Sequence, residues 1–181
     1  MMIRRWTRTP LALTLALLSV GMTGCTAGMV DPSIRGPFRG QVVDAATGQP
    51  IEGAVAVAVW WEVIPTPVQG QERFYDAAEG VTGPDGRFEI PRAATRAPKL
   101  GVQPAQVSIF APGYQEQRRR ISPPDGRQFV DPTVVEMRRL TTREERITNM
   151  DAVSLSSVPR ERIPRLREAI SRERAALGFK P

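Results

Sequence analysis

Few of the residue types that carry catalysis occur in this chain. Its 181 residues include no histidine, which removes the commonest general base and the commonest metal ligand. The only lysines are Lys99, in a predicted loop, and Lys180, near the last residue, and neither position favours activation of a serine. The acidic residues Asp76 and Glu79 form a pair without a distinguishing context. We therefore expect a protein that is not an enzyme and holds no cofactor and no metal.

The first residues have the composition of a secretory signal peptide. Three arginines and no acidic residue precede Cys25: Arg4, Arg5 and Arg8. The apolar stretch at 11–20 is too short to cross a membrane as a helix and has the length of a signal-peptide core. We expect residues 1–24 to direct export and then to be removed.

The residues Met22, Thr23, Gly24 and Cys25 resemble a lipobox, in which the cysteine is acylated by fatty acids such as palmitate and becomes the new N-terminus. Several acyl chains would anchor the protein firmly, because each buried methylene contributes about 0.8 kcal/mol. Thr26 resembles the pattern of lipoproteins sent to the outer membrane, so we expect a cell-envelope protein with its anchor there, facing the periplasm. The alternatives are the inner membrane, the cell surface, or ordinary secretion after cleavage at Ala27.

Removal of the leader changes the charge and leaves no disulfide. The formal charge of +6 falls to +3, because the leader contains three arginines and no acid. This mildly basic balance gives no reason to expect a nucleic-acid partner. Cys25 is the only cysteine, so the domain must be held by its core alone. Residues 25–37 are rich in Gly, Pro and small side chains and are predicted to form a tether.

From residue 38 onward, short apolar runs alternate with turn residues, as in a mainly β fold. Strands are predicted at 38–44, 53–63, 105–111 and within 114–140, with a further run at 74–81. The sequence at 82–91 predicts a hairpin that turns at Asp85-Gly86 and points Phe88 and Ile90 inward. Six or seven short strands with regular turns favour a β-sandwich.

The run at 53–63 is apolar on both sides. Its alternating residues form one side with valines and the other with three alanines and a tryptophan: Ala54, Ala56, Ala58 and Trp60. A strand with two dry sides is usually internal. One side belongs in the core, and we expect the alanine side to be covered by another part of the chain or by a partner.

Three segments, at 47–55, 82–91 and 109–114, together resemble the carboxypeptidase regulatory-like domain. This resemblance implies a seven-stranded, prealbumin-like (transthyretin-like) β-sandwich over residues 38–140. It also implies a non-catalytic module, since the peptidase chemistry of such proteins lies in a separate zinc domain. Insertions at 63–73 and 92–104 depart from the family's pattern.

The tail at 141–181 changes to helical spacing and predicts a C-terminal pair of α-helices. Thr142 and Glu145 fit a capping box that starts a helix at about 143–153. Pro164 is best placed in the first turn of a second helix that ends at Gly178. The apolar stripe of that helix contains Leu166 and Ile170. It can pack on the alanine side of the sandwich, or it can dock on a partner with its arginines outward.

These features predict a structural or protein-interaction module that is attached to a membrane through lipid on Cys25. The expected partner is another envelope protein. The candidate interaction surface comprises six residues: Ala54, Ala56, Ala58, Trp60, Leu166 and Ile170. The alternative is a lipoprotein that binds a glycan or a small molecule, and an exposed Trp60 or Tyr114 beside polar groups would favour it.

Overall fold

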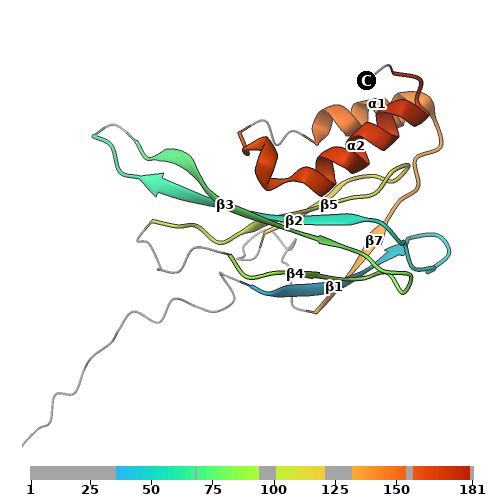
Figure 1. Cartoon of the computed structure of the whole chain (residues 1–181), viewed down its shortest axis with the longest axis horizontal. Coiled ribbons are helices and arrows are strands. Elements are labelled where there is room, and N and C mark those ends of the chain that lie inside the picture. Colours follow the sequence, from blue (N-terminus) through green and yellow to red (C-terminus); the bar gives the residue numbers. More distant parts are fainter. Residues whose placement is uncertain (1–35, 68, 94–100, 121–131, 154–156, 180–181) are drawn as a thin grey trace, which may run out of the picture.

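A computed structural model of the chain describes residues 36–67, 69–93, 101–120, 132–153 and 157–179. Within these residues, seven strands form two sheets and two α-helices follow (Figure 1), which confirms the predicted mainly β sandwich with a helical C-terminal part. The three-stranded sheet has the order β4-β1-β7 and the four-stranded sheet the order β3-β2-β5-β6. The strands are β1 (Phe38–Asp44), β2 (Val55–Ile64), β3 (Gln71–Val81), β4 (Arg87–Ile90), β5 (Gln106–Phe110), β6 (Gln117–Arg120) and β7 (Thr133–Met137).

The three-stranded sheet is built around the first strand of the domain. β1 pairs antiparallel with β4 and parallel with β7, so it lies between two strands that come later in the sequence. Its alternation sends Phe38 and Val42 into the core and Arg39 outward, where Arg39 forms an ion pair with Glu89 of β4. The inward residues meet Ala56, Ala58 and their neighbours from the opposite sheet.

β2 lies in the middle of the four-stranded sheet and is buried on both sides, as its apolar alternation predicts. Its alanines and Trp60 lie in the core between the two sheets, where Trp60 stacks on Phe38 with ring centroids 6.0 Å apart. The opposite side, with Val55, Val57 and Val59, packs against the C-terminal helices. The helices therefore pack on the sandwich, which was one of the two predicted alternatives, but they cover its valine side and not its alanine side.

The turn at residues 83–86 forms as predicted, but it does not close a hairpin. The Gly86 N–H donates to the Gly83 carbonyl at 2.9 Å, and Phe88 and Ile90 point inward. β3 and β4 nevertheless belong to different sheets, so this turn carries the chain from one sheet to the other. The two backbones come very close here, since a Cβ on Gly80 would lie 2.3 Å from the Glu89 carbonyl oxygen.

The first predicted insertion is an extension of the β2–β3 pair. Val63 pairs with Glu72 and Ile64 with Gln71, so both ends of 63–73 are strand and the connection is confined to 65–70. Pro65 and Pro67 lie in the connection, where no ladder hydrogen bond is required of them. Of the second insertion, residues 94–100 lie outside the described part of the chain, and Gly101 and Gln103 bond to the backbone of β2.

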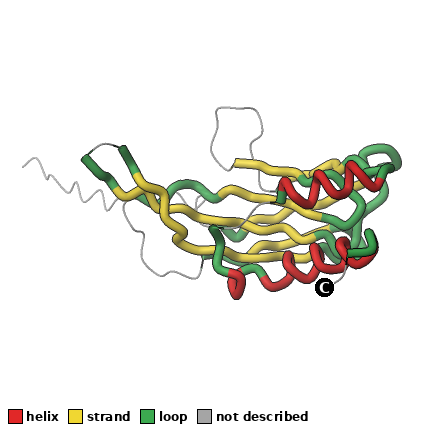
Figure 2. Tube along the Cα trace, turned by 90° about the horizontal axis from the view of Figure 1, so that it is seen from above, coloured by secondary structure: helices red, strands yellow, loops and turns green. Residues whose placement is uncertain are grey.

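The two helices lie over the outer side of the four-stranded sheet and run roughly along its strands (Figures 1 and 2). α1 (Arg143–Ala152) begins with the predicted capping box of Thr142 and Glu145. α2 (Pro164–Ala176) has its proline in the first turn and is followed by Gly178 at φ +82°, again as predicted. A short 3-10 turn, η2 (Arg160–Arg162), leads into α2. We call the segment from α1 to Phe179 the helical layer.

Candidate interaction surface

The helical layer is fixed to β3 by a buried acidic residue. The side chain of Asp76 is 4% exposed and forms an ion pair with Arg162 of η2. The same guanidinium donates to the Ala77 carbonyl at 3.1 Å. Because Asp76 is buried, loss of Arg162 would remove a cationic partner from a carboxylate that water cannot easily reach. One half of the acidic pair noted in the sequence therefore has a structural role.

Glu79, the other half of that pair, caps the second helix from the neighbouring strand. Its carboxylate accepts hydrogen bonds from the backbone N–H groups of Arg165, at 3.0 Å, and Leu166, at 2.8 Å. These groups belong to the first turn, where helical N–H groups have no partner within the helix. Pro164 precedes them and has no N–H to satisfy. A negative charge at this end is also favoured by the helix dipole.

Two further contacts hold α1 in place. Arg146 of α1 makes a bidentate ion pair with Glu173 of α2, at 2.6 and 2.7 Å, and Glu173 is 2% exposed. Asn149 donates to the Tyr114 carbonyl at 3.1 Å and accepts from the Glu116 N–H at 2.7 Å. The first contact joins the helices to each other, and the second joins α1 to the connection between β5 and β6.

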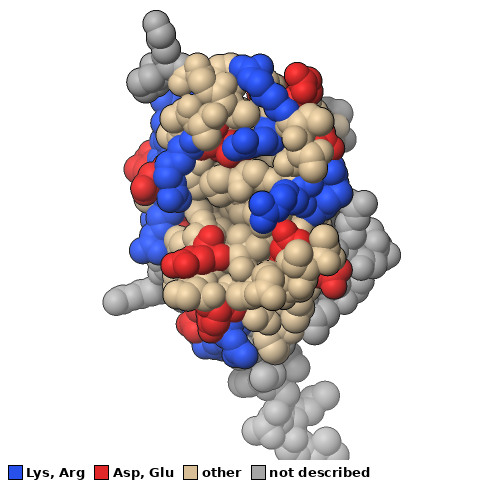
Figure 3. Space-filling model, turned by 90° about the vertical axis from the view of Figure 1, so that its right-hand side faces the viewer, with Lys and Arg blue, Asp and Glu red and all other residues tan. Residues whose placement is uncertain are grey.

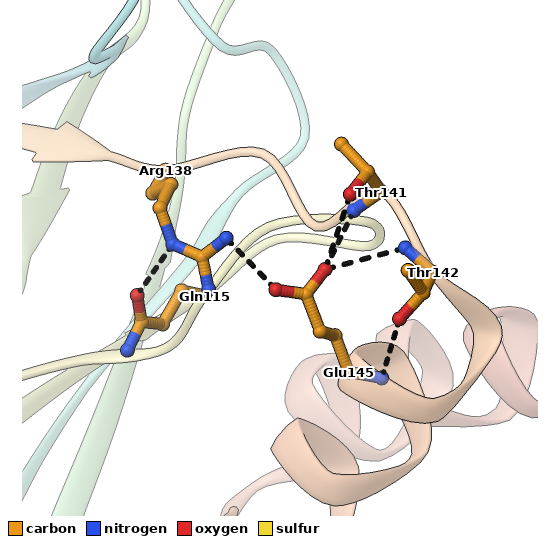
Figure 4. Close-up of polar contacts among 5 residues, drawn as sticks. All are labelled: Gln115, Arg138, Thr141, Thr142 and Glu145. Carbon is orange, nitrogen blue, oxygen red and sulfur yellow. Dashed lines mark hydrogen bonds and ion pairs between the residues drawn. The ribbon is translucent and has the colours of Figure 1, made fainter.

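The start of α1 is linked to β7 through Glu145 (Figure 4). Its carboxylate accepts from the N–H groups of Thr141, at 2.9 Å, and Thr142, at 3.2 Å, and it pairs with Arg138 at 3.0 Å. These backbone hydrogen bonds, followed by the contribution of Arg138, lower the pKa of Glu145 to about 2. The carboxylate is therefore ionised over nearly the whole pH range.

The outward side of the helical layer contains a groove. Two adjoining hollows, of about 820 and 550 Å³, share four residues: Arg160, Arg167, Ile170 and Arg174. Phe179 and Ala175 complete the larger hollow, and Val158 and Leu166 contribute to the smaller one. Within the described part of the chain, none of the three arginines forms an ion pair. We call this the arginine groove.

The candidate surface residues divide between core and groove. Ala54, Ala56, Ala58 and Trp60 are at most 1% exposed and lie between the sheets, so they cannot form a surface of the folded domain. Leu166 is 1% exposed on the inner side of α2 and contributes only to the smaller hollow, whereas Ile170 is half-buried and lines both hollows. This corrects the predicted set because the strand alternation could not show which apolar side faces the second sheet.

The aromatic residues considered for ligand binding are not open platforms. Trp60 is buried in the core, while Trp61 on the other side meets Phe74 edge to face at 6.2 Å. The Tyr114 hydroxyl donates to Asp44 at 3.1 Å and accepts from Arg139 at 2.6 Å. Burial, then the bond to Asp44, raises the pKa of Tyr114. Tyr114 thus ties the β5–β6 connection to the end of β1.

Apart from the arginine groove, a hollow of about 580 Å³ lies on the three-stranded sheet. Its lining includes Arg39, Gln41, Arg87 and Val134, and Val134 is 64% exposed. Here the charges of the arginines are compensated, since Arg39 pairs with Glu89 and Arg87 with Asp85.

On the end of the molecule seen in Figure 3, basic and acidic side chains are interspersed, with most of the basic ones in the upper half.

Cys25, together with Met22, Thr23 and Gly24, lies outside the described residues, so lipidation stays a prediction. Neither helix in the described part of the chain has the length and apolar character of a membrane span. In the same residues, no three acidic or thiol side chains are grouped as metal ligands.

Comparisons with known proteins give no family for this chain. No family model matches the sequence, and no curated protein matches it. Among solved structures, a 9R-lipoxygenase from Cyanothece PCC8801 aligns with 57% of this chain at 19% identity and a TM-score of 0.24. The alignment spans only 16% of the length of that enzyme. A likeness this low supports no inference about fold or activity.

Proposed function

We propose that this chain is a lipoprotein of a bacterial envelope, anchored through Cys25 in the outer membrane and facing the periplasm. Its folded part acts as a non-catalytic module that binds another envelope protein. The anchor is supported by the arginine-rich leader, the short apolar stretch and the lipobox-like residues before Cys25. The carboxypeptidase regulatory-like resemblance supports a binding module and carries no catalytic residue to this chain.

The observation that carries the binding proposal is the arginine groove. The inner side of the helical layer covers Val55, Val57 and Val59, whereas its outer side presents apolar walls and three arginines that form no ion pair with any described residue. Arginine and aromatic side chains are enriched at protein interfaces, and a concave site with apolar walls accepts side chains of a partner. The groove is therefore the part of the described surface best suited to contact another protein.

The test is crosslinking in cells that make the tagged, full-length protein, followed by mass spectrometry. We expect one recurrent envelope protein to be crosslinked to the anchored form and to be reduced or lost with Cys25→Ser. Fractionation checks the anchor separately, because Cys25→Ser should move the protein out of the membrane fraction. A correctly anchored and folded protein that captures no recurrent partner would refute the binding role.

Glycan or small-molecule binding is the second candidate, and the hollow on the three-stranded sheet favours it. Its volume of about 580 Å³ is within the range of ligand sites. Its compensated charges suit a neutral ligand better than an ion. Ligand screening of the purified protein, with Val134→Glu as the site variant, separates this role from protein binding.

A further inference from the structure

We infer that the arginine groove binds an acidic segment of a protein partner, in which two carboxylates flank an apolar side chain. This inference rests on the proposed binding role and names the chemistry of the partner. It depends on three features of the groove: the spacing of its arginines, their lack of ion partners among the residues that the structure describes, and the apolar walls between them.

The spacing places the positive charges along one line. Arg167 and Arg174 are seven residues apart on α2, so they lie on the same side of the helix, two turns or about 10 Å apart. Arg160 comes from η2 and lines both hollows with them. A planar guanidinium can bind a carboxylate through two parallel hydrogen bonds. Carboxylates seven residues apart on a helical segment would match this spacing and lie on one side of that segment.

Among the described residues, the acidic side chains in and next to the helical layer form no ion pair with these arginines. Glu173 is buried and bound to Arg146, and Glu79 is used by the first turn of α2. Asp151 is the acidic residue that lines the groove, on its α1 wall. It forms no ion pair within the described residues and would repel a carboxylate placed at that wall. A carboxylate of the partner is therefore attracted to the wall of the groove that α2 forms, and not to the wall that α1 forms.

The walls between the arginines are apolar, and one of them is held in place. Phe179 lies against two guanidinium groups, with its ring centroid 5.5 Å from Arg143 and 5.2 Å from Arg174. These contacts fix both the ring and the direction of Arg174. Together with Ile170 and Ala175, Phe179 forms a wall for an apolar side chain.

A protein segment fits these observations better than an anionic membrane surface. The arginines surround a hollow of about 820 Å³, whereas a helix that binds a bilayer presents a continuous apolar side to it. The exposed Glu161 and Glu168 follow Arg160 and Arg167 in the sequence and line neither hollow. They therefore weaken attraction to an extended anionic surface more than attraction to a segment that enters the groove.

The experiment measures binding of the full-length protein in neutral detergent micelles to a fluorescein-labelled, helix-forming peptide that carries two glutamates seven residues apart with leucines between them. Fluorescence anisotropy should show binding that weakens with added salt. The same peptide with glutamine in place of glutamate should bind at least about tenfold more weakly, since its charge-assisted hydrogen bonds are lost. The double variant Arg167→Gln/Arg174→Gln should lose affinity for the acidic peptide by a similar factor.

The matched control is Arg165→Gln/Arg172→Gln, which removes the same charge from exposed positions of α2 outside the groove. Equal losses in both double variants would overturn the inference, because they would reflect overall charge alone. Binding of phosphatidylglycerol vesicles but not of the peptide would overturn it in favour of a membrane surface. If the folded protein still crosslinks its cellular partner after Arg167→Gln/Arg174→Gln, the chemistry assigned to the groove is wrong while the proposed binding role stands.

Discussion

At the residue scale, four carboxylates fix the helical layer in place: Asp76, Glu79, Glu145 and Glu173. Three of them pair with arginines, while Glu79 caps α2, and Glu145 also closes the start of α1. Glu173 joins the two helices to each other, and the other three link the layer to the sandwich. Each accepts hydrogen bonds from groups that folding would otherwise leave without partners. These acidic residues therefore fix the position of one element on another.

The stability contributed by Glu145 should depend on pH. Its pKa in the folded state is about 2, below the ordinary value of 4.5, so the ionised form stabilises the fold above pH 4.5. This contribution is lost as the pH falls from about 4.5 to about 2. We expect Glu145→Gln to lower the free energy of unfolding at pH 7 and to approach the unmodified protein near pH 2. Urea unfolding followed by circular dichroism across this range measures the difference.

Glu144→Gln is the control for that series, because Glu144 lies in the same helical turn and outside the capping box. It should change the stability at pH 7 by less than Glu145→Gln does. A constant difference between Glu145→Gln and the unmodified protein from pH 7 to pH 2 would contradict the assignment of the stabilisation to the ionised carboxylate.

At the scale of elements, the helical layer buries the second apolar side of β2, which would otherwise be exposed to solvent. β2 places one side in the core between the sheets, and the layer covers the other with Ile163, Leu166 and Ala169. The ends of the helices are set by local signals, namely the capping box, Pro164 and Gly178. Their position on the sheet is set by long-range contacts from β3.

The difference between local signals and long-range contacts explains which parts of the structure the sequence could predict. The strands near 38–44 and 105–111 and both helix starts follow from alternation and capping, which depend on neighbouring residues. The covered side of β2 could not be chosen, because valines and alanines are both apolar. The roles of Asp76 and Glu79 could not be found either, since their partners lie 86 or 87 residues away. Likewise, the groove needs Arg160 and Phe179, whose placement depends on η2 and on the turn after α2.

Arg146→Met should show how strongly the two helices depend on their ion pair. The change leaves the buried carboxylate of Glu173 without its partner, so we expect the free energy of unfolding to fall by about 3 kcal/mol. The double variant Arg146→Met/Glu173→Leu should recover most of this loss, because no buried charge remains. Chemical denaturation of the three proteins measures the effect. Arg172→Met, at an exposed position of α2, is the control, and an equally small loss for Arg146→Met would disprove the role of the pair.

At the scale of the whole molecule, the domain consists of a sandwich and a layer that depend on each other. Truncation after Leu140 would remove the cover from Val55, Val57, Val59 and Phe110. We expect the shortened protein to aggregate, since a continuous apolar patch would be exposed on the four-stranded sheet. Size-exclusion chromatography and binding of a hydrophobic dye test this. A monomeric truncated protein with an unchanged unfolding midpoint would show that the layer is dispensable for the fold.

The order of the elements along the chain also has a consequence for synthesis. The first seven residues of β2 are apolar and uncharged, and α2, which covers them, is made roughly a hundred residues later. At about 5–20 residues per second, the ribosome needs on the order of 5–20 s for this stretch. β1 must likewise wait for β7 before its sheet is complete. During that interval the nascent segment resembles those that assemble into cross-β aggregates, so we expect the nascent chain to need protection by a holding chaperone until its last helix is available.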